Sequence, residues 1–367
     1  MKIVFMGTPD FAVESLKSLY ESNKNIIAVV TNPDKPKGRG MKMIETPVKE
    51  YAKLKNIKIF QPLKVRGNTE FIEEIRKLEP DLLCVVAYGK ILPKEILDIP
   101  KYGAINVHGS ILPKYRGAAP IQWAVLNGEK ETGNTTMFMD EGMDTGDIIY
   151  QSKVTIGEEE TTGELWNKLA IDGGKLLLKT INKIEEIAET DQIKEIEKRY
   201  NDVLSKIQED TNGAEKIEKE IIDKGTLNER NNELQKEIKK QIGAKKQGDN
   251  FTLAPMLNKE MSYINWNEPA EKIHNLIRGL NPIMGAYSFY NGKKIKIWKA
   301  KVVEEKDLEG LQNAKPGTIV YVDKNTLIIK AKHQAISVIE IQAENSKRMQ
   351  IKDFLNGNKF AVNDKLQ

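Results

Sequence analysis

Residues 103–110, Gly-Ala-Ile-Asn-Val-His-Gly-Ser, hold a short apolar run that ends in polar side chains and a glycine. Because side chains alternate between the two faces of a strand, Asn106 and His108 lie on the same face. In sheets of parallel strands, ligands bind at the carboxyl ends of the strands. The stretch therefore predicts a strand that presents an amide and a titratable imidazole to a binding cleft.

On both sides of this stretch, short β-rich runs alternate with segments whose apolar residues recur at helical spacing. This alternation is typical of a doubly wound, mostly parallel sheet with helices on its faces. We therefore expect residues 1–187 to form a Rossmann-like α/β domain. The expected strands are 2–6, 26–30, 58–60, 81–87, 103–107, 135–139 and 148–154, and one long helix covers 162–184.

The segment 188–246 differs in composition from its surroundings, since 27 of its 59 residues are charged and none is proline. Its apolar residues recur every three or four positions, and Gly213 and Gly225 mark expected breaks. We predict a charged helical hairpin whose narrow apolar stripe pairs with itself or with one neighbour. Replacing Asp191–Gln241 by a short glycine-serine linker should then be tolerated.

Residues 247–367 change in character again, to a helix at 270–280 followed by short strands separated by turn signals. Five short strands predict a small OB-like β-barrel, a fold that commonly binds nucleic acids or sugars. This region has 18 basic and 13 acidic residues, an excess that is compatible with a nucleic-acid partner. The predicted strands are 286–290, 294–300, 317–322, 326–331 and 336–342.

Several classes of protein are excluded by composition. No apolar run approaches the roughly 20 residues of a membrane-spanning helix, and the N-terminus has no signal-peptide layout, so we expect a cytoplasmic protein. The single cysteine, Cys84, lies in the apolar run 82–86 and is expected to be buried and inert. The three histidines are far apart in the sequence, so we expect no bound metal.

A turn at 142–147, Gly-Met-Asp-Thr-Gly-Asp, supplies the carboxylate that an imidazole would need. Glycines on both sides of Asp144 free the backbone to direct its side chain inward, although Asp140 and Glu141 remain alternatives. An amide and an imidazole can stabilise an oxyanion while an external amine attacks a carbonyl carbon. This combination predicts acyl transfer without a covalent enzyme intermediate.

The turn after the first strand, residues 7–11, matches neither a dinucleotide fingerprint nor a phosphate loop. The sequence therefore does not favour a nicotinamide or nucleoside-triphosphate cofactor.

The chain resembles the methionyl-tRNA formyltransferase family through several motifs that occur in order. The resemblance covers residues 1–187 and 247–367, where the C-terminal motifs separate it from relatives that share only the catalytic domain. The motifs are 5–12 (FMGTPDFA), 87–93 (AYGKILP), 106–122 (NVHGSILPKYRGAAPIQ), 142–147 (GMDTGD), 277–282 (IRGLNP), 285–287 (GAY) and 353–357 (DFLNG).

This resemblance implies that 10-formyltetrahydrofolate donates a formyl group to the α-amino group of methionine on initiator tRNA. It assigns the catalytic roles to Asn106, His108 and Asp144. The implied folate contacts are Ser110, Ile111, Leu112, Pro113, Tyr88, Gly89, Ile91 and Leu92. Residues 32–43 resemble a mobile tRNA-contacting loop, with Arg39, Lys37 and Lys42 as its basic residues.

Two other functions remain open at this stage. A folate-dependent formyltransferase acting on a small amine, such as a phosphoribosylglycinamide or an amino sugar, would use the same trio without needing the basic loop or the barrel. A non-catalytic RNA-binding protein would need only the barrel. The resemblance also implies a short linker where this chain has residues 188–246, which assigns that segment no role. We expect the protein to be a monomer, with residues 1–187 catalytic and residues 247–367 binding tRNA.

Overall fold

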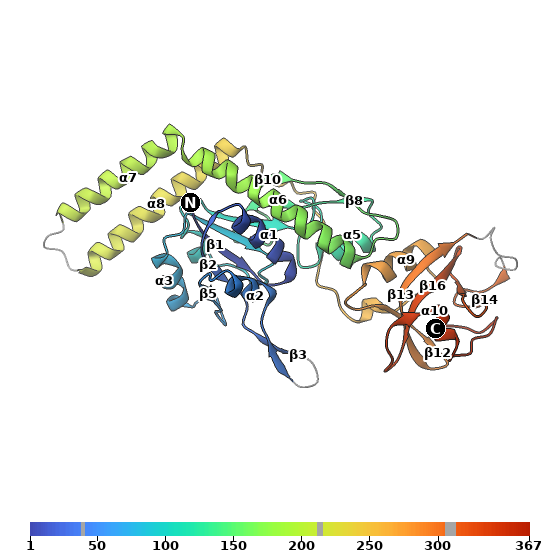
Figure 1. Cartoon of the computed structure of the whole chain (residues 1–367). Helices are drawn as coiled ribbons and strands as arrows, with labels where there is room; N and C mark the ends of the chain where they lie inside the picture. Colours follow the sequence, from blue (N-terminus) through green and yellow to red (C-terminus); the bar gives the residue numbers. More distant parts are fainter. Residues whose placement is uncertain (38–40, 211–215, 305–312) are drawn as a thin grey trace. The chain divides into compact units, whose positions relative to one another are not determined.

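The computed structural model describes residues 1–37, 41–210, 216–304 and 313–367, which form two compact units (Figure 1). The first unit comprises Met1–Arg116, Gly133–Lys153 and Lys168–Leu253. The second comprises Gly117–Thr132, Val154–Asn167 and Ala254–Gln367. Two short segments, 117–132 and 154–167, therefore pack with the C-terminal part of the chain. Within the described residues, no helix is both long enough and apolar enough to cross a membrane.

A seven-stranded sheet in the order β10-β9-β7-β6-β1-β2-β5 forms the centre of the first unit. Strands β7, β6, β1, β2 and β5 run parallel, and β9 and β10 join them antiparallel. This confirms the predicted mostly parallel sheet. Its strands are β1 (Lys2–Gly7), β2 (Asn25–Val30), β5 (Ile59–Phe60), β6 (Leu82–Val86), β7 (Ala104–His108), β9 (Thr135–Phe138) and β10 (Ile148–Gln151).

Helices cover both faces of this sheet, so its central strands are apolar on each face. On one face, Val4, Val30 and Val85 share a buried cluster with side chains of α3 and α4. All five residues of β6 are buried, among them Cys84, whose thiol pKa is raised by burial. The helices that cover the two faces are α1 (Asp10–Glu21), α2 (Pro47–Leu54), α3 (Thr69–Lys77), α4 (Lys94–Leu97) and α6 (Thr162–Ala188).

The charged segment forms a helical hairpin, as predicted, from α7 (Asp191–Asp210) and α8 (Lys216–Ile242), which lie side by side (Figure 1). Gly225 lies inside α8, so the break predicted there is wrong, and Gly213 falls outside the described residues. We call residues 191–242 the arm.

The arm packs against the connection between β6 and β7. Asn231 donates a hydrogen bond to the Ile99 carbonyl at 3.0 Å, and Gln235 donates to the Pro100 carbonyl at 2.9 Å. Ile193, Leu234 and Ile238 are fully buried. Deletion of the arm would therefore expose apolar surface, contrary to the tolerance expected from its narrow stripe.

The second unit contains the antiparallel sheet β12-β13-β16-β15-β14, with β17 paired to β16. This confirms a C-terminal antiparallel β domain, and its closure into an OB-like barrel stays a prediction. Its strands are β12 (Ala286–Tyr290), β13 (Lys293–Val303), β14 (Ile319–Val322), β15 (Leu327–Lys330), β16 (Ala335–Ala343) and β17 (Met349–Gln350), and β8 (Glu131–Thr132) pairs with β11 (Val154–Thr155). Its helices are α5 (Pro120–Leu126), the 3₁₀ turn η1 (Glu260–Ser262), α9 (Ala270–Gly279) and α10 (Ile351–Leu355).

Both outer strands of the five-stranded path form hydrogen bonds with the last residues of the chain. The Phe289 amide of β12 donates to the Gln367 carbonyl at 2.7 Å, and the Ile319 amide of β14 donates to the Asp364 carbonyl at 2.8 Å. These bonds satisfy edge backbone groups that would otherwise be open to another strand.

Candidate functional site

His108 lies at the carboxyl end of β7 and is 6% exposed. Its Nε2 is 2.8 Å from the Tyr115 carbonyl oxygen, and its Nδ1 is 3.5 Å from Oδ2 of Asp144. A carbonyl oxygen can only accept, so Nε2 carries a proton in this arrangement. The structure thus holds the imidazole between the loop that follows β7 and the carboxylate of Asp144.

The turn at 140–147 resolves which carboxylate faces the imidazole. Oδ1 of Asp140 accepts hydrogen bonds from the Gly142 amide at 3.0 Å and the Thr145 hydroxyl at 2.6 Å, so this side chain holds the turn itself. Asp144 has a φ of +55°, an uncommon conformation for a residue with a side chain. A Cβ atom at position 146 would collide with the Phe138 carbonyl, which explains the glycine there.

Asn106 lies on β7, two residues before His108, and its side chain is half-buried. Its Nδ2 donates a hydrogen bond to the Val85 carbonyl of β6 at 3.2 Å. An amide nitrogen has two N–H groups, so the second is available to a bound substrate. The side-chain oxygen is buried and has no hydrogen-bond partner among the described residues. The structure thus brings Asn106, His108 and Asp144 together at one end of the sheet.

The predicted folate loop after β7 is held by backbone and hydroxyl contacts. Ser110 is fully buried, with its hydroxyl donating to the Lys114 carbonyl at 2.6 Å. Thr135 of β9 donates to the Ser110 carbonyl at 2.7 Å and accepts from the Leu112 amide at 3.1 Å. Leu112 is buried, whereas Ile111 and Pro113 are half-buried. Thr135 is a supporting residue that the sequence motifs alone did not indicate.

A hollow of about 980 Å³ lies in the first unit and includes two of the predicted folate residues, Ile91 and Leu92. We call it the β6–α4 hollow, and it is lined by Leu63–Arg66, Lys90–Glu95 and Glu141. Ile91 is 72% exposed, whereas Leu92 is buried. Glu141 belongs to the turn that carries Asp144, so the hollow adjoins the predicted catalytic turn. Its size is sufficient for a cofactor-sized ligand.

The structure places the other two predicted folate residues differently from each other. The Tyr88 ring is buried in the core cluster between the sheet and α3, and burial raises the pKa of its phenol to about 12. Its hydroxyl has no hydrogen-bond partner among the described residues. Gly89 is exposed and has a φ of +77°. The phenol of Tyr88 therefore stays protonated at neutral pH, and its ring packs in the core beneath the loop 88–93.

The predicted tRNA loop is a two-stranded hairpin formed by β3 (Lys35–Lys37) and β4 (Lys42–Ile44). Arg39 lies outside the described residues, as does the side chain of Lys37, and Lys42 is exposed. The base of the hairpin is anchored, because Lys49 donates to Asp34 at 2.6 Å. The Lys49 ammonium lowers the pKa of Asp34 through this hydrogen bond.

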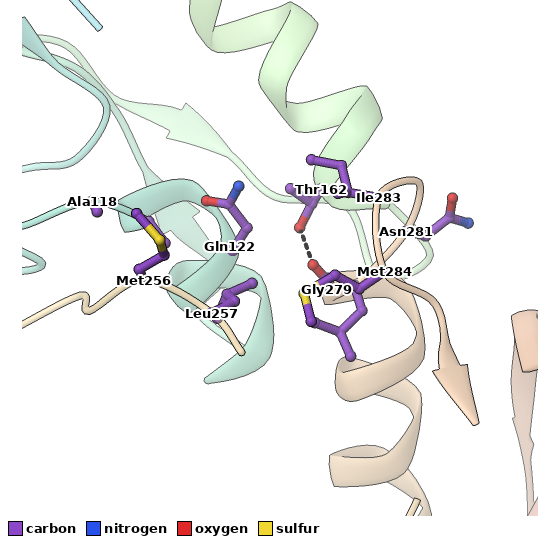
Figure 2. Close-up of a pocket in the computed structure, with 11 residues that line it drawn as sticks. Ala118, Gln122, Thr162, Met256, Leu257, Gly279, Asn281, Ile283 and Met284 are labelled. Carbon is purple, nitrogen blue, oxygen red and sulfur yellow. Dashed lines mark hydrogen bonds between the residues drawn. The ribbon is translucent and has the colours of Figure 1, made fainter. Parts of the chain in front are cut away.

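A separate cavity of about 200 Å³ lies in the second unit (Figure 2). Its lining carries no charged side chain, and the Thr162 hydroxyl donates to the Gly279 carbonyl at 2.8 Å across one end. The cavity suits an uncharged, apolar group. It is lined by Ala118, Ala119, Gln122, Thr162, Met256, Leu257, Gly279, Leu280, Asn281, Ile283 and Met284.

Among the described residues, no group of three or more histidine, cysteine or carboxylate side chains is placed to hold a metal ion.

A further contact of the site involves Arg116 and Gln247, which the sequence patterns did not single out as functional. Gln247 follows the arm in a stretch that has neither periodicity nor a motif, so no sequence signal marked it.

Comparison with known proteins gives a consistent family. Residues 1–181 match the family model described as formyl transferase, and residues 256–359 match the model of its C-terminal domain. The chain is 44% identical to the methionyl-tRNA formyltransferase of Caldanaerobacter subterraneus subsp. tengcongensis, over 97% of both chains. It is 41% identical to that of Clostridium beijerinckii, over 100% of both chains. The latter match spans 367 residues, so it extends over the segment 188–246 of this chain.

Solved structures support the fold at lower sequence identity. The N-formyltransferase from Helicobacter canadensis, in complex with folinic acid and dTDP-3-aminofucose, is 19% identical with a TM-score of 0.58, covering 94% of this chain and all of that one. HypX from Aquifex aeolicus, in complex with tetrahydrofolic acid, is 14% identical with a TM-score of 0.55, covering 97% of this chain and 47% of that one.

Proposed function

Since the chain belongs to the methionyl-tRNA formyltransferase family, we propose that Asn106, His108 and Asp144 form its catalytic site. The protein transfers the formyl group of formyl-tetrahydrofolate to the α-amino group of methionine on initiator methionyl-tRNA, which gives N-formylmethionyl-tRNA for translation initiation. The observation that carries the site assignment is the 3.5 Å separation between Nδ1 of His108 and Oδ2 of Asp144, at the end of the strand that also carries Asn106.

The reaction requires one bond to form, one to break and one proton to move. The methionine amine bonds to the formyl carbon, the bond from that carbon to the folate nitrogen breaks, and a proton passes from the amine to that nitrogen. Asn106 stabilises the negative charge that develops on the formyl oxygen through its second Nδ2–H, and His108 does so through Nε2–H when that oxygen replaces the Tyr115 carbonyl as the acceptor. Asp144 orients the imidazole through Nδ1 and assists the proton transfer through water.

The donor is 10-formyltetrahydrofolate in this proposal, held by the loop 110–113 and by Tyr88, Gly89, Ile91 and Leu92. Support comes from the β6–α4 hollow, which contains Ile91 and Leu92 beside the turn of Asp144. The buried ring of Tyr88 shapes the loop and does not line the hollow. The proposed reaction uses no metal ion, because Asn106 and His108 polarise the formyl carbonyl by hydrogen bonding.

The division of labour along the chain is part of the same proposal. Residues 1–187 carry the formyl transfer, residues 188–246 form the inserted arm, and residues 247–367 bind tRNA through an OB-like barrel. The protein acts as a monomer in the cytoplasm, where aminoacylated tRNA is available to it.

Formyl transfer to charged initiator tRNA tests this function directly. With 10-formyltetrahydrofolate as donor, methionyl-tRNA is expected to be formylated, while phosphoribosylglycinamide and amino-sugar nucleotides are not. The 41–44% identity to methionyl-tRNA formyltransferases, against 19% to an amino-sugar enzyme, favours this outcome. Faster turnover of a small amine would assign the chain to the alternative substrate class, and no transfer to any amine would support a binding protein.

Replacing Arg39, Lys37 or Lys42 by alanine is expected to raise the KM for tRNA and to leave the KM for folate unchanged. Each lost phosphate contact should reduce the salt dependence of tRNA binding by a slope of about 1. The measurement is steady-state formylation at several salt concentrations, with Lys198→Ala on the exposed side of α7 as the matched control. A higher KM for folate with unchanged tRNA binding would assign the hairpin to the other ligand.

A further inference from the structure

Gln247 connects the two loops that flank His108. Its side-chain oxygen accepts hydrogen bonds from Nε and Nη2 of Arg116 at 2.9 and 2.7 Å. Its Nε2 donates to the backbone carbonyl of Asp144 at 2.9 Å and to that of Gly146 at 2.8 Å. We propose that Gln247 is a positioning residue for formyl transfer, one that fixes Asp144 relative to His108. This inference rests on the proposed catalytic role of those two residues.

The orientation of the Gln247 amide is determined by its partners. A guanidinium group offers only donors and a backbone carbonyl offers only an acceptor, so the amide oxygen must face Arg116 and the amide nitrogen must face the turn. Rotation of the amide by 180° would lose all four hydrogen bonds. A fully paired side chain of this kind holds both neighbours in one geometry.

The neighbours that Gln247 holds are the ones on which the catalytic geometry depends. Arg116 follows Tyr115, whose carbonyl contacts Nε2 of His108. On the other side, the Asp144 carbonyl belongs to the residue with the uncommon φ of +55°. Gln247 therefore links Asp144, which faces Nδ1 of the imidazole, to Arg116, the neighbour in sequence of the residue that faces Nε2.

The rest of the strap, residues 245–252, supports the same two loops. The Tyr115 amide donates to the Thr252 hydroxyl at 2.8 Å, and the Arg116 amide donates to the Thr252 carbonyl at 2.8 Å. At the other end, Lys245 and Ile148 exchange two backbone hydrogen bonds of 2.8 Å. The strap is thus fixed at both ends, which keeps Gln247 in place between the loops.

Arg116 has a further dependence on Gln247. Its side chain is 9% exposed, and the centre of its guanidinium group lies 4.6 Å from the centroid of the Phe251 ring. The neutral amide oxygen of Gln247 accepts two of its N–H groups. Without that oxygen, a buried cation would lose its main acceptor, and the loop 108–116 would relax to find another.

The test separates positioning from folding by comparing kcat with KM. Gln247→Ala removes all four hydrogen bonds, and Gln247→Glu keeps an acceptor for Arg116 while losing both donations to the turn. Both variants are expected to lower kcat by about 10- to 100-fold, the usual effect of losing an orienting partner. The KM values for folate and tRNA should change by less than about threefold. The matched control is Gln235→Ala. This substitution removes one hydrogen bond from the arm to the Pro100 carbonyl and should leave kcat unchanged.

Several results would overturn the proposal. Unchanged kcat in Gln247→Ala would show that the turn holds Asp144 without help, and a rise in KM alone would make Gln247 a binding residue. Loss of a cooperative unfolding transition in both variants would make its role structural. A wild-type protein that fails to formylate methionyl-tRNA would contradict the proposed function itself, so the two failures are distinguishable.

Discussion

His108→Ala is expected to reduce kcat for formyl transfer by about 10²- to 10⁴-fold, the range for loss of a general acid-base or oxyanion-stabilising group. The imidazole contacts both the loop after β7, through Tyr115, and the carboxylate of Asp144. Asp144→Asn should act in the same direction, because an amide cannot pair with an imidazolium as a carboxylate does. Single-turnover formylation at saturating folate and tRNA measures the effect on the chemical step.

The matched control is His333→Ala, since this histidine is exposed in the turn between β15 and β16. It should retain wild-type kcat. Folate binding and the unfolding temperature of His108→Ala should stay close to those of the wild type, which would confirm that the loss is chemical. Turnover near the wild-type rate in His108→Ala would contradict the proposed mechanism.

Replacement of Asp191–Gln241 by a short glycine-serine linker is expected to destabilise the first unit severely. Ile193, Leu234 and Ile238 are fully buried, and burial of each such side chain stabilises a protein by about 1.5–3 kcal/mol. The three together amount to roughly 5–9 kcal/mol, which is comparable to the whole stability of many domains. The deletion also removes donors to the Ile99 and Pro100 carbonyls. We expect insoluble protein or a large fall in the unfolding temperature.

A shorter deletion provides the comparison. Removing residues 205–222 and joining the two helices by a short turn retains the buried residues Ile193, Leu234 and Ile238 and the hydrogen bonds of Asn231 and Gln235. This variant should be soluble and should retain formyl transfer. If the long deletion were equally soluble and active, the contacts of the arm would contribute little to the stability of the first unit.

The sequence predicted the sheet and the site more completely than it predicted what supports them. Short apolar runs located β1, β6 and β7, and strand alternation placed Asn106 and His108 on the same face of β7. The docking of the arm was missed because it depends on Asn231 and Gln235, and polar residues on a charged helix carry no pattern that identifies a partner. Gln247 was missed for a related reason, since a single amide outside any motif acquires its role only when distant loops fold around it.

Residue patterns alone did not choose among Asp140, Glu141 and Asp144; the family resemblance assigned Asp144, and the structure places Asp144 beside His108. Composition leaves three carboxylates within five residues, and only the hydrogen bonds from Gly142 and Thr145 show that Asp140 is used within the turn. Likewise, nothing in the periodicity of residues 117–132 and 154–167 indicates that they pack with the second unit. Long-range packing of short segments is decided by shape, which a local pattern does not contain.

The buried thiol of Cys84 gives this protein a built-in reporter. It is the one cysteine of the chain and lies in the central strand of the first unit, fully covered and with a raised pKa. Alkylating reagents act on the exposed thiolate, so they can reach Cys84 only when that strand opens. The rate of labelling would therefore measure the opening of the first unit alone, even in a mixture with its substrates, without a dye or an engineered residue.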